Sequence, residues 1–116
     1  MNLAIDFDGT VVRDNYPLIG PELPGAIQTL KELQSQGHKL ILWTCRAHDQ
    51  KLLNEAIAWC TERGLTFDGV APGKISAYFY IDDKSIDWLN DPQSLDTKWE
   101  RIKETVERAE IMRRRG

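Results

Sequence analysis

The sequence has few cysteines and histidines, and it has no surplus of positive charge. Among 116 residues there are two cysteines, two histidines, and 15 lysines and arginines against 18 aspartates and glutamates. The spacing of Cys45 and Cys60 matches no zinc or redox motif, so we expect two small buried hydrophobic side chains, with a disulfide as the less favoured alternative. A formal net charge of -3 gives no broad basic surface, which leaves a nucleic-acid partner unsupported.

Long apolar runs are absent as well. No stretch approaches the length of a membrane span, and Met1 and Asn2 lead straight into a strand-like run without a basic segment before a long apolar one. We therefore expect a cytoplasmic protein with no membrane partner. The length predicts a single domain, residues 1–116, whose one core must also carry any active site. Nothing in the sequence indicates an oligomeric state.

Strand-like and helical segments alternate along the chain. Strands are expected at residues 2–6, 38–44, 65–71 and 77–82, and helices at 22–36, 49–63 and 95–113. This alternation predicts an α/β fold with a mainly parallel sheet, in which right-handed crossovers place helices on the sheet faces in three α/β/α layers. In such open sheets, ligands bind at the carboxyl ends of the strands.

Acidic, basic and hydroxyl side chains gather at these strand ends, namely Asp6, Asp8, Thr44, Arg46, Lys74, Asp82 and Asp83. Converging carboxylates repel one another by about 4 kcal/mol for a unit pair at roughly 4 Å and an effective dielectric constant near 20. Mg²⁺ is the natural partner for such a set, because it takes oxygen ligands and completes its coordination with water and substrate phosphate. Lysine and threonine side chains then suit the phosphoryl oxygens that the metal does not reach.

Four separated motifs resemble those of the haloacid dehalogenase (HAD)-like superfamily, in the family order. They are "DFDGT" at 6–10, "LILWT" ending at Thr44, Lys74, and "YIDD" ending at Asp83. The resemblance implies a Rossmann-like, HAD-like fold and a Mg²⁺-dependent phosphatase that cleaves a small phosphomonoester through an aspartyl-phosphate. Residues 11–43 and 45–73 leave no room for a cap domain, so we expect an open, capless site with residues 13–25 as its lip.

Carried over to this chain, the resemblance makes Asp6 the nucleophile and Asp8 the general acid and then the general base. Their spacing fits these roles, because residues i and i+2 of an extended chain share one side while Phe7 points into the core. We expect a neighbouring negative charge to favour the protonated form of Asp8.

The resemblance also implies a set of phosphate-binding residues. Thr44 would donate to a phosphoryl oxygen, and Lys74 would neutralise charge on the phosphate, with Lys84 as a nearby competitor. Gly9 and Thr10 would let the chain turn beneath the site and would offer backbone N–H groups to the phosphate.

The implied metal ligands are Asp6, the backbone carbonyl of Asp8 and one acid of the final pair. Asp83 is the preferred direct ligand, and Asp82 would act through water or through another ligand. Position alone suggests the residues that contact the substrate's leaving group: Arg13, Tyr16, Arg46 and His48.

Two other functions remain as alternatives. The chain could be a non-catalytic HAD-like binding or scaffold protein, which would keep the fold without turnover. It could also be a receiver-like phosphoacceptor domain, which likewise gathers acids, a hydroxyl and a lysine at a parallel sheet edge. The spaced acidic pair after the first strand disfavours the receiver hypothesis, since a receiver domain carries a lone phosphorylated aspartate after a middle strand.

Overall fold

A four-stranded parallel sheet organises the chain in the computed structural model, which describes residues 1–71, 79–81 and 94–115. The strands are β1 (Asn2–Ile5), β2 (Lys39–Leu42), β3 (Gly69–Val70) and β4 (Phe79–Ile81). The helices are α1 (Ala26–Ser35), the 3₁₀ helix η1 (Cys45–His48), α2 (Gln50–Glu62) and α3 (Ser94–Arg115). None of these helices, over the residues described, is long and apolar enough to cross a membrane.

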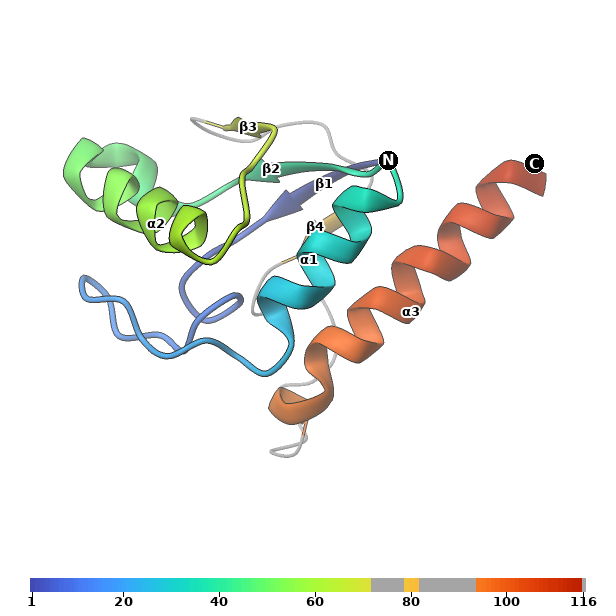
Figure 1. Cartoon of the computed structure of the whole chain (residues 1–116), viewed down its shortest axis with the longest axis horizontal. Coiled ribbons are helices and arrows are strands. Elements are labelled where there is room, and N and C mark those ends of the chain that lie inside the picture. Colours follow the sequence, from blue (N-terminus) through green and yellow to red (C-terminus); the bar gives the residue numbers. More distant parts are fainter. Residues whose placement is uncertain (72–78, 82–93, 116) are drawn as a thin grey trace.

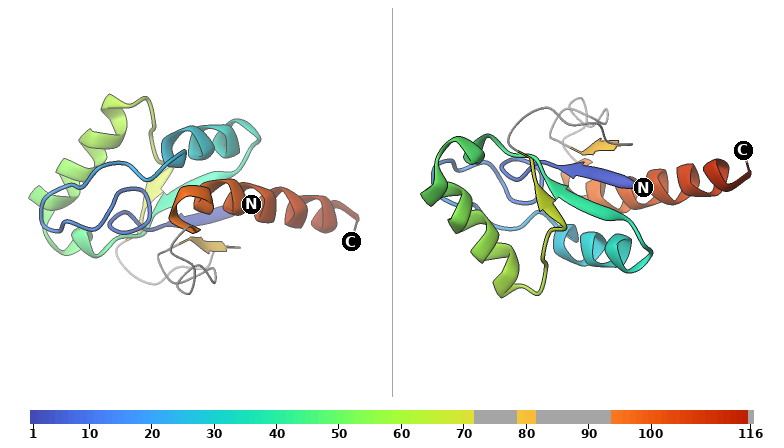
Figure 2. Two further views of the ribbon diagram at one scale, coloured as in Figure 1. Left: turned by 90° about the horizontal axis from the view of Figure 1, so that it is seen from below. Right: turned by 90° about the horizontal axis from the view of Figure 1, so that it is seen from above.

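The strands are arranged in the order β3-β2-β1-β4, so the direction in which successive strands are added to the sheet reverses at β1. The chain steps from β1 outward to β2 and β3 and then places β4 on the other side of β1, as both views in Figure 2 show. Every described strand pair is parallel, and Ile5 is paired with Leu42 on one side and with Ile81 on the other. The expected α/β fold with a parallel sheet is therefore confirmed. The order differs from the 2-1-3-4 arrangement of receiver domains.

One hydrophobic core joins the sheet to the helices. Leu3 and Ile5 of β1 are fully buried in this core, together with Phe7 just beyond the strand. Figure 1 shows α1 and α3 side by side on the same face of the sheet, and an ion pair between Lys103 and Glu32 links these two helices. The described elements establish the sheet and one helical layer, whereas the third layer of the α/β/α arrangement stays a prediction.

The first helix is shorter than expected, because α1 begins at Ala26 and not at residue 22. The N–H of Leu23 donates to the carbonyl of Val11 at 2.9 Å, so it belongs to the preceding loop. Gly25 then adopts φ +77°, a left-handed conformation that stops the helix from extending backwards. The residues before α1 therefore form a lip that is tied to the loop after β1.

The second helix begins within one residue of its expected start, and Asp49 caps it. The side chain of Asp49 accepts hydrogen bonds from the N–H groups of Lys51 and Leu52, at 3.0 and 3.4 Å, which satisfies two donors of the first turn of α2. The short 3₁₀ helix η1 ahead of it was not predicted. The strand β2 ends at Leu42, two residues earlier than expected, and Thr44 lies between the end of β2 and the start of η1.

Both cysteines are free thiols, as expected, but their surroundings differ. Cys60 is buried on α2, and burial raises the pKa of its thiol to about 12. Cys45 is exposed at the start of η1, so the expectation of a buried side chain is wrong there. The exposure follows from its place in a turn outside the sheet.

Candidate active site

Asp6 lies where the order of the sheet reverses. Its N–H donates to the carbonyl of Ile81 at the end of β4, at 2.9 Å, and the N–H of Trp43 after β2 donates to the carbonyl of Ile5 at 2.8 Å. The end of β1 is therefore held between the ends of its two neighbours. This reversal point is where open parallel sheets bind their ligands.

Several of the expected site residues cannot be compared with the structure. Lys74, its competitor Lys84, and the acids Asp82 and Asp83 lie outside the described residues. The strand that leads to the acidic pair is described, and its last residue, Ile81, is the one bonded to Asp6. The phosphate-site lysine and the direct metal ligand among the two acids therefore stay predictions.

The loop after β1 is a tight turn closed by its own backbone. Gly9 has φ +81°, its N–H donates to the carbonyl of Val12 at 2.8 Å, and the N–H of Thr10 donates to the carbonyl of Phe7 at 3.1 Å. The N–H groups of Gly9 and Thr10 are thus used within the loop, contrary to our expectation that they face a phosphate. Within the described part of the chain, the N–H groups of Phe7 and Asp8 have no acceptor.

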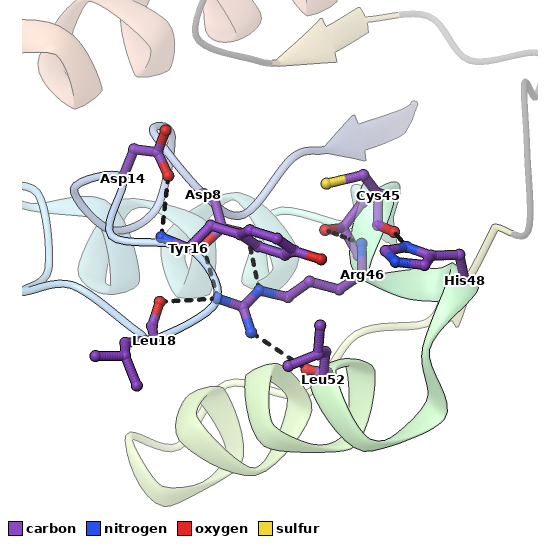
Figure 3. A network of polar contacts seen from close by, with 9 residues as sticks. Asp8, Asp14, Tyr16, Leu18, Cys45, Arg46, His48 and Leu52 are labelled. Atoms are coloured by element: carbon purple, nitrogen blue, oxygen red, sulfur yellow. Dashed lines mark hydrogen bonds and ion pairs between the residues drawn. The ribbon is translucent and has the colours of Figure 1, made fainter.

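Asp8 forms a two-point ion pair with Arg46. Arg46 Nε donates to Asp8 Oδ2 at 2.7 Å, and Nη2 donates to Oδ1 at 2.8 Å (Figure 3). The Arg46 side chain is 0% exposed and that of Asp8 is 9% exposed, so the pair is shielded from water. A bidentate guanidinium–carboxylate pair fixes both the position and the orientation of the carboxylate.

Arg46 also ties together the segments around this pair. Its Nη2 donates to the carbonyl of Leu18 in the lip at 3.0 Å, and its guanidinium carbon lies 5.3 Å from the ring centres of both Phe7 and Tyr16. Hydrogen bonding to Asp8 raises the pKa of Arg46, so the side chain stays positively charged. Figure 3 shows the guanidinium enclosed between the lip and α2.

These contacts add to two expectations from the sequence. Arg46 was expected to contact substrate, and the structure places it fully buried and bonded to Asp8. Asp8 was expected to have a negative neighbour, and the structure shows a cation bonded to it that the sequence did not indicate. The sequence could not reveal the pair, because the two residues are 38 positions apart and no local spacing relates them.

Thr44 occupies the position expected of a phosphate-binding hydroxyl. It follows Trp43 in an extended conformation, is 7% exposed, and its hydroxyl oxygen accepts the N–H of Arg46 at 3.2 Å. Accepting this bond leaves the hydroxyl hydrogen free to be donated elsewhere. The other leaving-group candidates lie nearby on the surface: Arg13 and Tyr16 are exposed on the lip, and exposed His48 is hydrogen-bonded to the carbonyl of Cys45.

The Cys45 thiol is close enough to Asp6 and Asp8 for their negative charges to act on it. Its pKa is raised, first by partial burial and then by the charges of Asp6 and Asp8. Cys45 comes from the end of β2 and the two acids from the end of β1. Side chains from two neighbouring strand ends therefore act on one another across the sheet edge.

The described residues offer oxygen ligands for a metal but not a complete site. No group of three or more Asp, Glu, His or Cys side chains suited to a metal is found within residues 1–71, 79–81 and 94–115. The carbonyl of Asp8 accepts no hydrogen bond from the described residues, while its carboxylate is occupied by Arg46. This arrangement fits the expected ligand set, in which Asp6 binds through its side chain and Asp8 through its backbone carbonyl.

Two contacts at the acidic loop come from α3 and were not predicted. Lys98 donates to the carbonyl of Gly9 and Trp99 donates to the carbonyl of Thr10. Thr10 itself is fully buried, and its hydroxyl oxygen has no hydrogen-bond partner in the part of the chain that the structure describes. The sequence carries no signal that would join residues separated by 89 positions.

The comparisons with known proteins place the chain in a family. No family model matches it, and no curated protein matches it. A solved structure of a conserved protein from Bacteroides thetaiotaomicron has 38% sequence identity, covers 94% of this chain and 91% of its own, and superposes with a TM-score of 0.79. The chain belongs to the same family as that protein. The two proteins thus have similar sequences and a similar fold over nearly the whole length of both chains.

A second solved structure is more distant. D,D-heptose 1.7-bisphosphate phosphatase from B. bronchiseptica, complexed with magnesium and phosphate, has 22% sequence identity and a TM-score of 0.46. It covers 64% of this chain and 51% of its own. A similarity at this level carries no argument about the activity of this chain.

Proposed function

We propose that this chain is a capless, HAD-like phosphohydrolase that uses Mg²⁺ to cleave a phosphomonoester through an aspartyl-phosphate on Asp6. The observation that carries the proposal is the backbone bond from Asp6 to Ile81, at 2.9 Å. It joins the "DFDGT" motif to the strand that contains the first two residues of "YIDD", at the reversal point of the sheet, where a ligand is expected. Thr44 follows the strand on the other side of β1.

In the proposed reaction, a carboxylate oxygen of Asp6 attacks phosphorus. A bond forms between Asp6 and phosphorus, the bond to the leaving oxygen breaks, and Asp8 gives that oxygen a proton. Asp8 then takes a proton from water, which attacks phosphorus and releases phosphate and the Asp6 carboxylate. The N–H groups of Phe7 and Asp8, which have no acceptor among the described residues, are suited to hydrogen-bond the phosphoryl oxygens during both steps.

Mg²⁺, when bound, would neutralise phosphate charge and align it with Asp6. The residues proposed to hold it are Asp6, the carbonyl of Asp8, and Asp83 or Asp82. Thr44 and Lys74 are proposed to bind the phosphoryl oxygens that face away from the metal. The substrate is proposed to be a small phosphorylated molecule. The site is proposed to be open, because residues 11–43 and 45–73, which flank Thr44, leave no room for a cap.

The Asp8–Arg46 pair favours a second candidate function. Both oxygens of Asp8 accept hydrogen bonds from the buried Arg46, so in this arrangement the carboxylate is engaged by Arg46 and not directed at a leaving group or a water molecule. A HAD-like protein that binds a phosphorylated ligand without cleaving it would keep such a pair. Binding without turnover is therefore the alternative to hydrolysis.

The two functions are separated by assaying hydrolysis of an aryl phosphate by the purified protein with and without Mg²⁺. The proposed function predicts release of phosphate that requires Mg²⁺ and is lost in Thr44→Val, which keeps the shape of the side chain and removes the hydroxyl. A protein that binds phosphate in a Mg²⁺-dependent manner by calorimetry, with release equal to the buffer blank, would establish the binding function instead.

A further inference from the structure

The C-terminal helix holds the acidic loop through two consecutive side chains. Lys98 Nζ donates to the carbonyl of Gly9 at 3.1 Å, and Trp99 Nε1 donates to the carbonyl of Thr10 at 3.0 Å. Lys98 is 0% exposed and Trp99 is 1% exposed. Neighbouring donors on α3 thus bind neighbouring acceptors in the turn that follows Asp6 and Asp8.

A lysine is an unexpected choice for this position. Burying an ammonium group costs several kcal/mol unless opposite charge and hydrogen-bond acceptors compensate for the lost water. The other side chains that α3 buries in the described core are apolar, namely Trp99, Ile102 and Val106. A neutral donor, Trp99, holds the carbonyl of Thr10, so the hydrogen bond to Gly9 does not by itself require the positive charge of Lys98.

The buried cations of the described chain share one location. Within the described residues, the buried basic side chains of lysine and arginine are Arg46 and Lys98. Arg46 binds the carboxylate of Asp8, and Lys98 binds the carbonyl of the next residue, Gly9. Both fixed positive charges therefore lie against the loop that carries the two acids.

We infer that Lys98 is a positioning residue of the proposed site, which holds the acidic loop and supplies a fixed positive charge that balances part of its negative charge. The inference rests on the proposed function, since it assigns Lys98 a role toward the cation site at Asp6. The protein balances some of the loop's charge with Lys98, and a divalent cation balances the remainder. Lys98 and the cation therefore oppose each other electrostatically.

Because of this repulsion, removing Lys98 should change the affinity for the cation in a direction that loss of a purely structural contact would not. Removing its charge should strengthen cation binding, because a like charge is removed from the vicinity of the metal. At an effective dielectric constant near 20 and a separation of roughly 10 Å, the repulsion between a unit charge and a divalent cation changes the affinity for that cation by at least about tenfold. Loss of a merely structural contact would loosen the loop and weaken cation binding.

The test is calorimetric titration of Mg²⁺ into the whole protein without substrate. Lys98→Gln, which keeps a hydrogen-bond donor and removes the charge, should bind Mg²⁺ at least about tenfold more tightly than wild type, and Lys98→Arg should bind it with nearly wild-type affinity. Trp99→Phe is the matched control, because it removes the neighbouring hydrogen bond and leaves the charge unchanged. It should not tighten binding.

The outcomes separate the inference from the proposed function. Equal or weaker Mg²⁺ binding by Lys98→Gln would overturn the inference while leaving the proposed function intact. Absence of Mg²⁺ binding in wild type would overturn both. If Lys98→Gln does not fold, nitrogen NMR of the wild-type lysine ammonium groups decides: the slowly exchanging signal of buried Lys98 should shift on Mg²⁺ addition, and an unchanged signal would overturn the inference.

Discussion

Arg46 and Asp8 are joined by two hydrogen bonds, Nε to Oδ2 at 2.7 Å and Nη2 to Oδ1 at 2.8 Å, in a pair hidden from solvent. The pair connects the end of β1 to the turn after β2, two segments that local spacing does not relate. It fixes the second acid of "DFDGT" in one orientation. The fold around the candidate site should therefore depend on it.

Arg46→Met is expected to lower the free energy of unfolding by about 3–5 kcal/mol, because it leaves the carboxylate of Asp8 buried without its partner. Arg46→Lys keeps the charge but loses the two-point geometry, so its cost should lie between wild type and Arg46→Met. Urea unfolding measures both values. In the double variant Arg46→Met with Asp8→Asn, part of the loss should be recovered. A cost of Arg46→Met below about 1 kcal/mol would show that the pair does not hold the site.

Gly20→Ala is expected to displace the lip. A Cβ at Gly20 would lie 2.1 Å from the backbone carbonyl oxygen of Arg13, so the segments of the lip around Arg13 and Gly20 must move apart. We expect a loss of about 1–3 kcal/mol of unfolding free energy and faster cleavage within residues 13–21 in limited proteolysis. Gly37→Ala is the control: its φ of +97° makes it costly, but nothing lies within 4 Å of the added carbon and it is far from the lip. Equal proteolysis of the lip in both variants would contradict this account.

Asp68 should make stability depend on pH. The N–H of Leu40 and then the side chain of Gln34 donate to its carboxylate, and they lower the pKa of Asp68. A group with a lowered pKa in the folded state stabilises the fold above its unfolded pKa, and this contribution is lost as the pH falls through the folded-state value. Asp68→Asn should therefore be less stable than wild type at neutral pH, and the difference should shrink below about pH 4.

Urea unfolding of wild type and Asp68→Asn across this pH range checks the prediction. Gln34→Ala removes the second donor and should reproduce part of the effect, because the bond from Leu40 remains. A stability difference that is constant from pH 7 to about pH 3 would mean that the lowered pKa of Asp68 contributes nothing.

The two cysteines should differ in reactivity. Burial raises the pKa of Cys60 to about 12, so it should react with a thiol reagent only after unfolding. Cys45 is exposed but its pKa is also raised, in part by Asp6 and Asp8, so it should react more slowly than a free cysteine. Asp6→Asn should accelerate labelling of Cys45, whereas Asp14→Asn should not. Equal rates for the two variants would show that Asp6 does not act on Cys45.

The sequence predicts the parts of this fold that local pattern controls. The strand 2–6, the N-terminal boundary of the helix at 49–63 and the glycine that ends the first helix are found at or near their expected positions. The parallel sheet and the positions of Asp6 and Thr44 just after the paired strands β1 and β2 follow from alternation of strands and helices, because the carboxyl ends of parallel strands share one edge.

Long-range contacts of single side chains escaped prediction. Arg46 was expected to contact substrate, and Lys98 was expected only as part of a helix covering the sheet. Both are buried against the loop at Asp8 and Gly9, and neither position is marked by composition or periodicity. The start of α1 was misplaced for a similar reason, since Leu23 bonds to Val11 across the lip and not within a helix.

The central claim is that Asp6 attacks phosphorus, and it is tested most directly by stopping the reaction with acid during turnover of an aryl phosphate in Mg²⁺. Peptide mass spectrometry then determines whether a phosphoryl group is attached to Asp6. The account predicts a phosphorylated peptide containing Asp6 in wild type, no such adduct in Asp6→Asn, and no turnover by that variant. Turnover by Asp6→Asn at the wild-type rate would contradict it.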